Sequence, residues 1–254
     1  MPDYGTILYA VEGKTAKITL NRPEKRNALN DELVGELKRS LTSAASDPGV
    51  RVVVIEGAGK DFCSGADLAA LQRSAGATVE QNLANARWMG DLFVALRRHP
   101  RPVVAAVRGR ALAGGCGLAT ACDIILAAES AKFGYPEVNI GFIPAMVMAI
   151  LRRSVSEKRA FEMITGGEIL PAHEALEIGL INHVYPDERF DQQVQAFSDR
   201  LASKSASAIT LSKNLLYHMD GMTFESAIES GVHLNTIARM TEDCKHGVEQ
   251  FLTK

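Results

Sequence analysis

The stretch PVVAAVRGRALAGGCGLATACDIILAA, residues 102–128, contains the alternation on which the fold prediction rests. It opens and closes with continuous apolar runs of strand length, a pattern typical of strands that are buried on both faces of a parallel sheet. Between these runs lies a glycine-rich turn, followed by a short segment that we expect to be helical from about Cys116 to Leu118 onward. A strand, a helix and a second strand in this order predict an α/β fold with mainly parallel pairing.

The same alternation continues on both sides of this stretch. Strands are expected at residues 7–11, 17–20, 51–57 and 180–186, and helices at residues 31–45, 83–98, 157–165 and from Pro171 onward. After residue 186 only helical patterns remain, at residues 194–202, 208–217, 224–240 and near Val248. The sequence therefore predicts an α/β core at residues 1–190 and a C-terminal helical region at residues 191–254.

Composition excludes several classes of protein. The 254 residues include 28 basic and 30 acidic side chains, a net charge of −2, which gives no reason to expect nucleic acid or an anionic membrane as a partner. The four cysteines stand far apart without a CxxC pair, so we expect buried free thiols rather than metal ligands. The chain begins without the apolar segment of a secretory signal, and no apolar run approaches the ~20 residues of a membrane span. These features predict a soluble, cytoplasmic protein without a metal site.

Motifs for nucleotide binding and for serine hydrolases fail on inspection. GAGKDF, residues 57–62, begins like a dinucleotide-binding fingerprint but has Phe62 where the last glycine belongs. Neither GxxxxGK[ST] nor GxSxG occurs, and the six histidines show no HxxxH spacing.

Two glycine-containing turns are candidates for binding. FCSGADL, residues 62–68, places Gly65 in a tight turn, where glycine permits positive φ and close approach of a ligand to backbone amides. AGGCG, residues 113–117, lies between a strand and a helix. Bare amides at a helix N-terminus can hold an anion or a developing oxyanion. The alternative for both turns is packing against the sheet.

Glu137 is the candidate for proton transfer. It precedes the apolar stretch of residues 138–144, and a carboxylate among such neighbours is desolvated, which raises its pKa toward the range that suits an acid–base catalyst. The alternative is an ordinary exposed glutamate in a loop. A further cluster, Arg22, Lys25 and Arg26, follows a predicted strand, and its alternative reading is a solvated basic turn.

Five segments together resemble the crotonase (enoyl-CoA hydratase/isomerase) superfamily in order and spacing. They are NRPEKRNAL (residues 21–29), SGADL (64–68), AGGCGLATACD (113–123), GYPEVNIGFIP (134–144) and ITGGEILPAHEALEIGLINHVYP (164–186). The likeness covers essentially the whole chain. It implies a spiral of repeated ββα units and a C-terminal helical region that forms a homotrimer or a dimer of trimers.

The resemblance also implies a chemistry and a set of site residues. An acyl-CoA thioester would become an enolate held by the backbone amides of Ala66 and Gly114, with Glu137 transferring the proton. The residues implied for coenzyme A are Arg22, Lys25 and Arg26 near its phosphates, Ser64, Gly65, Ala66, Asp67 and Leu68 on its adenine side, and Phe251 and Lys254 from a neighbouring subunit. Coenzyme A is part of the substrate, so no separate cofactor is expected.

This sequence departs from the two-carboxylate hydratases at one position of the motif. Gly117 stands where those enzymes carry their first glutamate, whereas the second is retained as Glu137. We expect an enoyl-CoA hydratase first. A single-glutamate isomerase, a decarboxylase and a non-catalytic acyl-CoA-binding protein remain as alternatives. Residues 145–148, AMVM, replace a glycine-rich run and place flexible apolar groups beside the acyl pocket.

Overall fold

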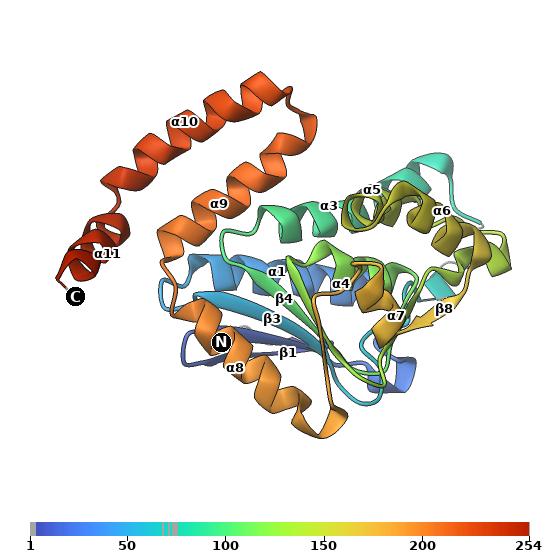
Figure 1. Cartoon of the computed structure of the whole chain (residues 1–254). Helices are drawn as coiled ribbons and strands as arrows, with labels where there is room; N and C mark the ends of the chain where they lie inside the picture. Colours follow the sequence, from blue (N-terminus) through green and yellow to red (C-terminus); the bar gives the residue numbers. More distant parts are fainter. Residues whose placement is uncertain (1–3, 68, 71, 73–75, 254) are drawn as a thin grey trace.

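The computed structural model describes residues 4–67, 69–70, 72 and 76–253, and these form two sheets with helices around them (Figure 1). The larger sheet has the strand order β1-β2-β3-β4-β6-β9. Its strands are β1 (Ile7–Glu12), β2 (Thr15–Leu20), β3 (Val52–Gly57), β4 (Val103–Val107), β6 (Ile124–Ala128) and β9 (His183–Tyr185). β1 and β2 are antiparallel and every later pair in this sheet is parallel. The predicted α/β class with mainly parallel pairing is confirmed.

A second, three-stranded sheet was not predicted. It comprises β5 (Arg110–Leu112), β7 (Lys132–Gly134) and β8 (Ile169–Pro171). β5 pairs with β7 in parallel, and β7 pairs with β8 antiparallel. Strands of three residues are too short to show an alternating pattern in the sequence. This small sheet leads directly into the glycine-rich turn and into the segment that carries Glu137.

Helices cover both faces of the larger sheet (Figure 1). The two faces of β3 alternate: Val53 and Ile55 join the main core, whereas Val52 and Val54 pack in a second cluster with Phe190. Helices α1 (Asp31–Ser46), α3 (Val79–Arg98) and α4 (Gly114–Ala121) lie on the first face, and α8 (Phe190–Ala202) covers the second. Because both faces are buried, the strands are continuously apolar, as the sequence showed.

The helix N-termini explain where prediction and structure differ. The Asn30 side chain caps α1 by accepting the Leu33 N–H at 3.0 Å. α3 begins four residues before the predicted start, because Thr78 and Gln81 form a capping box. α4 begins at Gly114, two residues before Cys116, so the predicted start was wrong.

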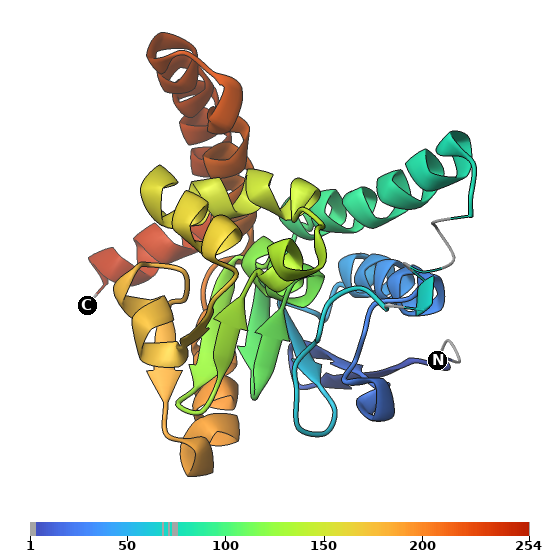
Figure 2. The same ribbon diagram turned by 90° about the vertical axis from the view of Figure 1, so that its right-hand side faces the viewer.

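The remaining helices are α5 (Ala145–Ser154), α6 (Glu157–Gly166), α7 (Ala172–Glu177), α9 (Ala206–His218), α10 (Phe224–Met240) and α11 (Glu242–Leu252). α9 and α10 form a hairpin that projects from the sheet-and-helix body (Figures 1 and 2). α11 lies beside the start of α9, where Asp243 accepts hydrogen bonds from Ser205 and Ser207. The predicted boundary after residue 190 falls at the first residue of α8, a helix that itself packs on the sheet. Among the described helices, none combines the length and the apolar character that crossing a bilayer requires.

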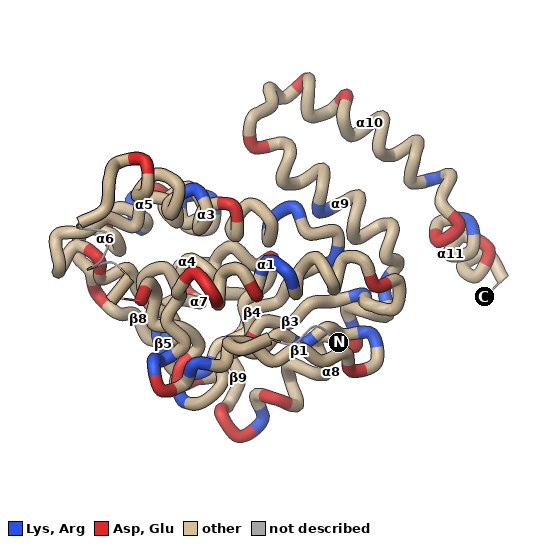
Figure 3. The backbone as a smooth tube through the Cα atoms, turned by 180° about the vertical axis from the view of Figure 1, so that it is seen from behind, with Lys and Arg blue, Asp and Glu red and all other residues tan. Residues whose placement is uncertain are grey.

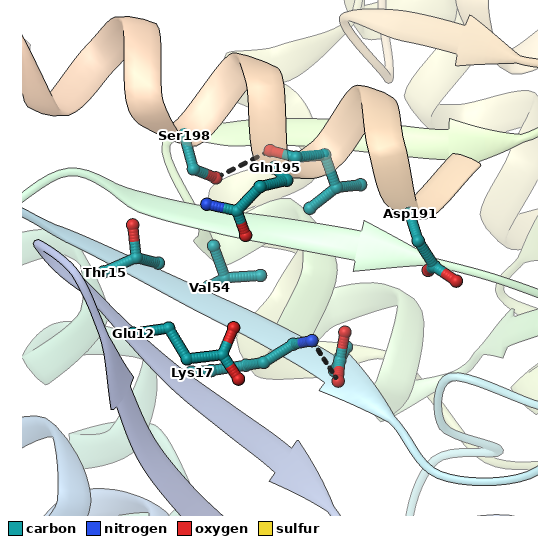
Figure 4. Close-up of a pocket in the computed structure, with 9 residues that line it drawn as sticks. Glu12, Thr15, Lys17, Val54, Asp191, Gln195 and Ser198 are labelled. Carbon is teal, nitrogen blue, oxygen red and sulfur yellow. Dashed lines mark hydrogen bonds and ion pairs between the residues drawn. The ribbon is translucent and has the colours of Figure 1, made fainter. Parts of the chain in front are cut away.

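A small cavity of about 30 Å³ lies between α8 and strands β1 to β3 (Figure 4). Its lining includes Thr15, Gln195 and the ion pair between Lys17 Nζ and Glu56 Oε1, which are 3.4 Å apart. A space of this size holds about one or two waters. It lies on the α8 face of the sheet, away from the glycine-rich turns, and is too small for an acyl-CoA.

Candidate active site

Two segments that are distant in the sequence, residues 22–29 and residues 61–67, run side by side. The Ser64 N–H donates to the Arg26 carbonyl at 3.0 Å, and the Leu29 N–H donates to the Gly65 carbonyl at 2.8 Å. The Asp67 N–H then donates to the Leu29 carbonyl at 3.0 Å. The structure thus brings together two of the segments that the resemblance implied for coenzyme A.

The backbone amides of Ala66 and Gly114 lie close to one another. A Cβ placed on Gly114 would stand 3.7 Å from the Ala66 nitrogen, and a Cβ placed on Gly65 would stand 3.1 Å from the Gly114 nitrogen. Within the described part of the chain, neither of these two N–H groups donates to a protein acceptor. Two such donors on neighbouring segments, one at the start of α4, can hold an oxyanion.

Ala113 holds the peptide that presents the Gly114 N–H. It has φ 51° and ψ −129°, a conformation that costs a non-glycine residue about 1–3 kcal/mol. Two hydrogen bonds maintain it: its N–H donates to the Gly134 carbonyl at 2.8 Å, and its carbonyl accepts the Gly117 N–H at 3.0 Å. The strained residue therefore fixes the orientation of the following amide before any ligand arrives.

Glu137 lies in a 3₁₀ turn, η2 (Pro136–Ile140), and is only 8% exposed. Its Oε2 atom is buried without a hydrogen-bond partner among the described residues. Burial raises the pKa of the Glu137 carboxyl above its ordinary value. The expected desolvation of this carboxyl is confirmed. Glu137 follows β7 by three residues, and the end of β7 is tied to the start of α4 through Gly134 and Ala113.

The three basic residues of the first segment occupy different environments. The Arg22 guanidinium donates to the Ala28 carbonyl at 2.6 Å and lies 3.1 Å from Asp67 Oδ2. Burial alone would raise the pKa of Asp67, but the hydrogen bonds and positive charges around it, chiefly from Arg22, hold that pKa below its ordinary value. Arg22 and Asp67 therefore tie the two segments together, whereas Lys25 and Arg26 are exposed.

Sequence reasoning missed the residues that hold this loop in place. Asp61 is 6% exposed and accepts from Arg110 Nε at 2.8 Å and Nη2 at 2.9 Å. The Asn27 amide donates to the carbonyls of Ala58 and Asp61 at 2.9 and 2.8 Å. Asn27 stood in a recognised motif. The pairing of Asp61 with Arg110, in contrast, joins separate elements and left no local signal.

Gly117 is buried in α4 and packs against Val147 of α5. A Cβ placed on Gly117 would overlap Val147 Cγ1 and lie 2.9 Å from Val147 Cβ. The position at which the resemblance implies a first glutamate thus has no room for a side chain while this valine is present.

The remaining predicted residues lie elsewhere or outside the described residues. Phe251 on α11 is 81% exposed, and Leu68 and Lys254 lie outside the described part of the chain. Free buried thiols are confirmed for Cys63, Cys116 and Cys122, whereas Cys244 is only partly buried. Burial raises the pKa of Cys63 to about 12 and that of Cys116 to about 11, so neither supplies a thiolate near neutral pH. The described histidine, cysteine and acidic side chains form no cluster suited to a metal ion.

Comparison with known proteins identifies the family to which this chain belongs. The family model for enoyl-CoA hydratase/isomerase matches residues 11–254. A Thermus thermophilus relative is 39% identical over 96% of each chain, and the 2,3-dehydroadipyl-CoA hydratase of Escherichia coli is 34% identical over 93% of this chain and 91% of that protein. The crystal structure of an enoyl-CoA hydratase from Mycobacterium smegmatis superposes with a TM-score of 0.93 and 31% identity, covering 98% of this chain and 96% of the other. The fold and these likenesses define a crotonase-type α/β protein. The chain belongs to the enoyl-CoA hydratase/isomerase family.

Proposed function

We propose that this protein binds acyl-CoA thioesters and transfers a proton at the carbon next to the thioester carbonyl, through an enolate. The observation that carries the proposal is the pair of unpartnered amides at Ala66 and Gly114. The thioester oxygen accepts both N–H groups and gains negative charge as the proton leaves. Each such donor contributes about 3 kcal/mol to the stability of the transition state. Glu137 is the acid–base group.

Hydration of a 2-enoyl-CoA is the first reaction we propose. Two relatives support it by name, the 2,3-dehydroadipyl-CoA hydratase of E. coli and the crotonyl-CoA hydratase of Syntrophomonas wolfei, each 34% identical. The Glu137 carboxylate takes a proton from water as the water oxygen bonds to the β-carbon, and the electrons of the double bond move into the enolate. The same carboxyl then returns its proton to the α-carbon, so one water is added and Glu137 is restored.

Isomerisation between 3-enoyl- and 2-enoyl-CoA is the second candidate, and the packing of Gly117 against Val147 favours it. Only one carboxylate is needed to move a proton from the α-carbon to the γ-carbon, and water takes no part. We expect the acyl chain to lie against the apolar side of α5.

Coenzyme A is bound, in this proposal, along the paired segments of residues 22–29 and 64–67. Lys25 and Arg26 are exposed beside them and supply positive charge for the phosphates. Ser64, Gly65 and Asp67 line the adenine side. No resident cofactor is required, because coenzyme A arrives with the substrate.

We also propose a homotrimer or a dimer of trimers assembled through the C-terminal helices. None of the described residues of α10 and α11 is buried within the chain. Their exposed apolar side chains are Phe224, Ile228, Val232, Ile237, Met240, Val248, Phe251 and Leu252. Charged residues are sparse along α10 (Figure 3). A groove of about 470 Å³ is lined by residues of α9, α10 and α11 on one side and by Arg51 and Arg101 of the body on the other. If a neighbouring subunit covers this surface, Phe251 and Lys254 would lie near the coenzyme A bound to that subunit. Light scattering tests the assembly, and a monomer at micromolar concentration would contradict it.

The function is tested with a panel of thioesters. Products from 2-enoyl-, 3-enoyl- and malonyl-type CoA are followed by liquid chromatography with mass spectrometry. Mass separates gain of one water from loss of carbon dioxide, and retention time separates an isomerised thioester from unreacted substrate of the same mass. Titration calorimetry with acetoacetyl-CoA, which resembles the enolate, is run in parallel. Turnover with binding supports the proposal. Binding without turnover or α-proton exchange identifies a non-catalytic acyl-CoA-binding protein, and no binding contradicts the whole assignment.

A further inference from the structure

The contact between α4 and α5 beside the amide pair suggests what controls the choice of reaction. Gly117 follows Gly114 by three residues in α4, and residues three apart share one face of a helix with their Cβ atoms about 5–6 Å apart. A side chain at position 117 would therefore stand next to the thioester held at Gly114.

Val147 occupies that space. It is 4% exposed, and its Cγ1 and Cβ both lie closer to a Cβ at position 117 than atoms in van der Waals contact allow. The crowding is local, because a Cβ on Gly114 would meet its nearest neighbours at ordinary distances of 3.6 to 3.8 Å. Position 114 thus has room for a side chain, whereas position 117 on the same helix face has none.

The segment that carries Glu137 leads directly into α5, which contains Val147. The Glu137 carbonyl accepts the N–H groups of Gly141 and Phe142, the latter at 3.0 Å, and the chain then enters α5 at Ala145. These hydrogen bonds fix the turn between the two residues. The position of the only carboxylate we assign to catalysis is therefore coupled to the position of the valine.

We propose that Val147 is a specificity-determining residue, which restrains water addition and leaves the proton shuttle of Glu137 intact. This inference rests on the proposed function. A methyl group of Val147 fills the place of a second carboxylate, so that water addition depends on Glu137 alone. In the shuttle, the Glu137 carboxylate removes a proton from C2 of a 3-enoyl thioester, the electron pair spreads into a dienolate, and the same carboxyl protonates C4. The double bond moves to C2–C3, and no atom is gained or lost.

The test measures a product ratio, which a purely structural role would not move. A 3-enoyl-CoA is given to the parent protein, to Val147→Gly and to the double variant Gly117→Glu/Val147→Gly. Hydrated and rearranged products are counted by liquid chromatography with mass spectrometry, because the rearranged thioester has the mass of its substrate. Glycine is chosen because alanine would retain the Cβ that lies 2.9 Å from the new side chain. Val194→Gly, which removes a buried valine from α8 on the other face of the sheet, controls for the loss of stability.

We expect the ratio of hydration to isomerisation to rise in Val147→Gly and to rise by about 10²-fold or more in the double variant, because a positioned base contributes at least this factor. Gly117→Glu alone should fail to fold or show no gain in hydration. An unchanged ratio in a folded, active double variant overturns the inference, and so does loss of both reactions in Val147→Gly when Val194→Gly retains them. Deuterium exchange at the α-carbon of a saturated acyl-CoA separates the two proposals: absence of exchange in the parent contradicts the proposed function, whereas exchange with an unmoved ratio contradicts only the role of Val147.

Discussion

Replacing Gly65 with alanine should damage catalysis in addition to lowering the stability of the fold. Gly65 is buried and has φ +96°, and an added Cβ would lie 2.7 Å from Ala113 Cβ, 3.0 Å from the Leu112 oxygen and 3.1 Å from the Gly114 nitrogen. All three neighbours belong to the turn that presents the Gly114 amide. The added methyl group therefore pushes directly on one of the two proposed oxyanion donors.

Two contributions set the expected size of the effect. The backbone conformation costs an L-residue about 1–3 kcal/mol of folding free energy. Displacing one oxyanion donor costs about 3 kcal/mol in the transition state, which is ~10²–10³-fold in turnover. Because this interaction strengthens only as charge develops, kcat should fall while the affinity for the thioester changes little.

Gly13→Ala is the matched control, because Gly13 also has a positive φ, +59°, but nothing lies within 4 Å of its added Cβ. It carries the backbone penalty without the contact. Urea unfolding measures the free energy of unfolding of both variants, and the rate of α-proton exchange measures the chemistry. If folded Gly65→Ala exchanges as fast as Gly13→Ala, the amide pair is not the oxyanion site.

Three further predictions concern charge. Burial raises the pKa of Glu137, so kcat/KM should rise with pH, with a midpoint above the pKa of a free glutamate. The folding stability that the protonated Glu137 contributes is complete below its pKa in the unfolded chain and is lost as pH rises through its pKa in the folded protein. Glu137→Gln should remove both pH dependences. Lys213→Met should lower the free energy of unfolding by about 3 kcal/mol, because it leaves Asp123, whose side chain is only 12% exposed and whose Oδ2 lies 2.7 Å from Lys213 Nζ, without its cation. Urea unfolding within 1 kcal/mol of the parent would contradict this. Lys25→Ala and Arg26→Ala should each raise KM a few-fold with little change in kcat, more at low salt than at high salt, and an effect on kcat alone would exclude a role in binding the phosphates.

The fold was predictable wherever burial left a periodic or continuous apolar pattern. β3, β4 and β6 were found close to their true bounds because both of their faces are covered. The missed strands β5, β7 and β8 have three residues each, so pairing across the chain defines them rather than composition. The early start of α3 did carry a signal, Thr78 followed by Gln81, which sequence reasoning overlooked.

The candidate site was predictable in its residues but not in its constraints. Family likeness supplied Ala66, Gly114 and Glu137, and the apolar stretch after Glu137 indicated its burial. The positive φ of Ala113 and the overlap between position 117 and Val147 depend on contacts between elements, which no local pattern encodes. The replacement of a glycine-rich run by AMVM at residues 145–148 was visible in the sequence. The contact of this segment with Gly117 depends on how α5 packs against α4, which the sequence does not show.

The most direct test of the central proposal compares Glu137→Gln with the parent protein in deuterated water, measuring α-proton exchange of a saturated acyl-CoA. Glutamine keeps the shape of the side chain and removes its basic oxygen, so exchange should fall ~10²–10⁴-fold while the affinity for acetoacetyl-CoA stays close to that of the parent. Glu174→Gln, an exposed glutamate on α7, is the control and should exchange at the parent rate. Exchange by Glu137→Gln at the parent rate, with the fold intact, would contradict the assignment of Glu137 as the proton-transfer residue.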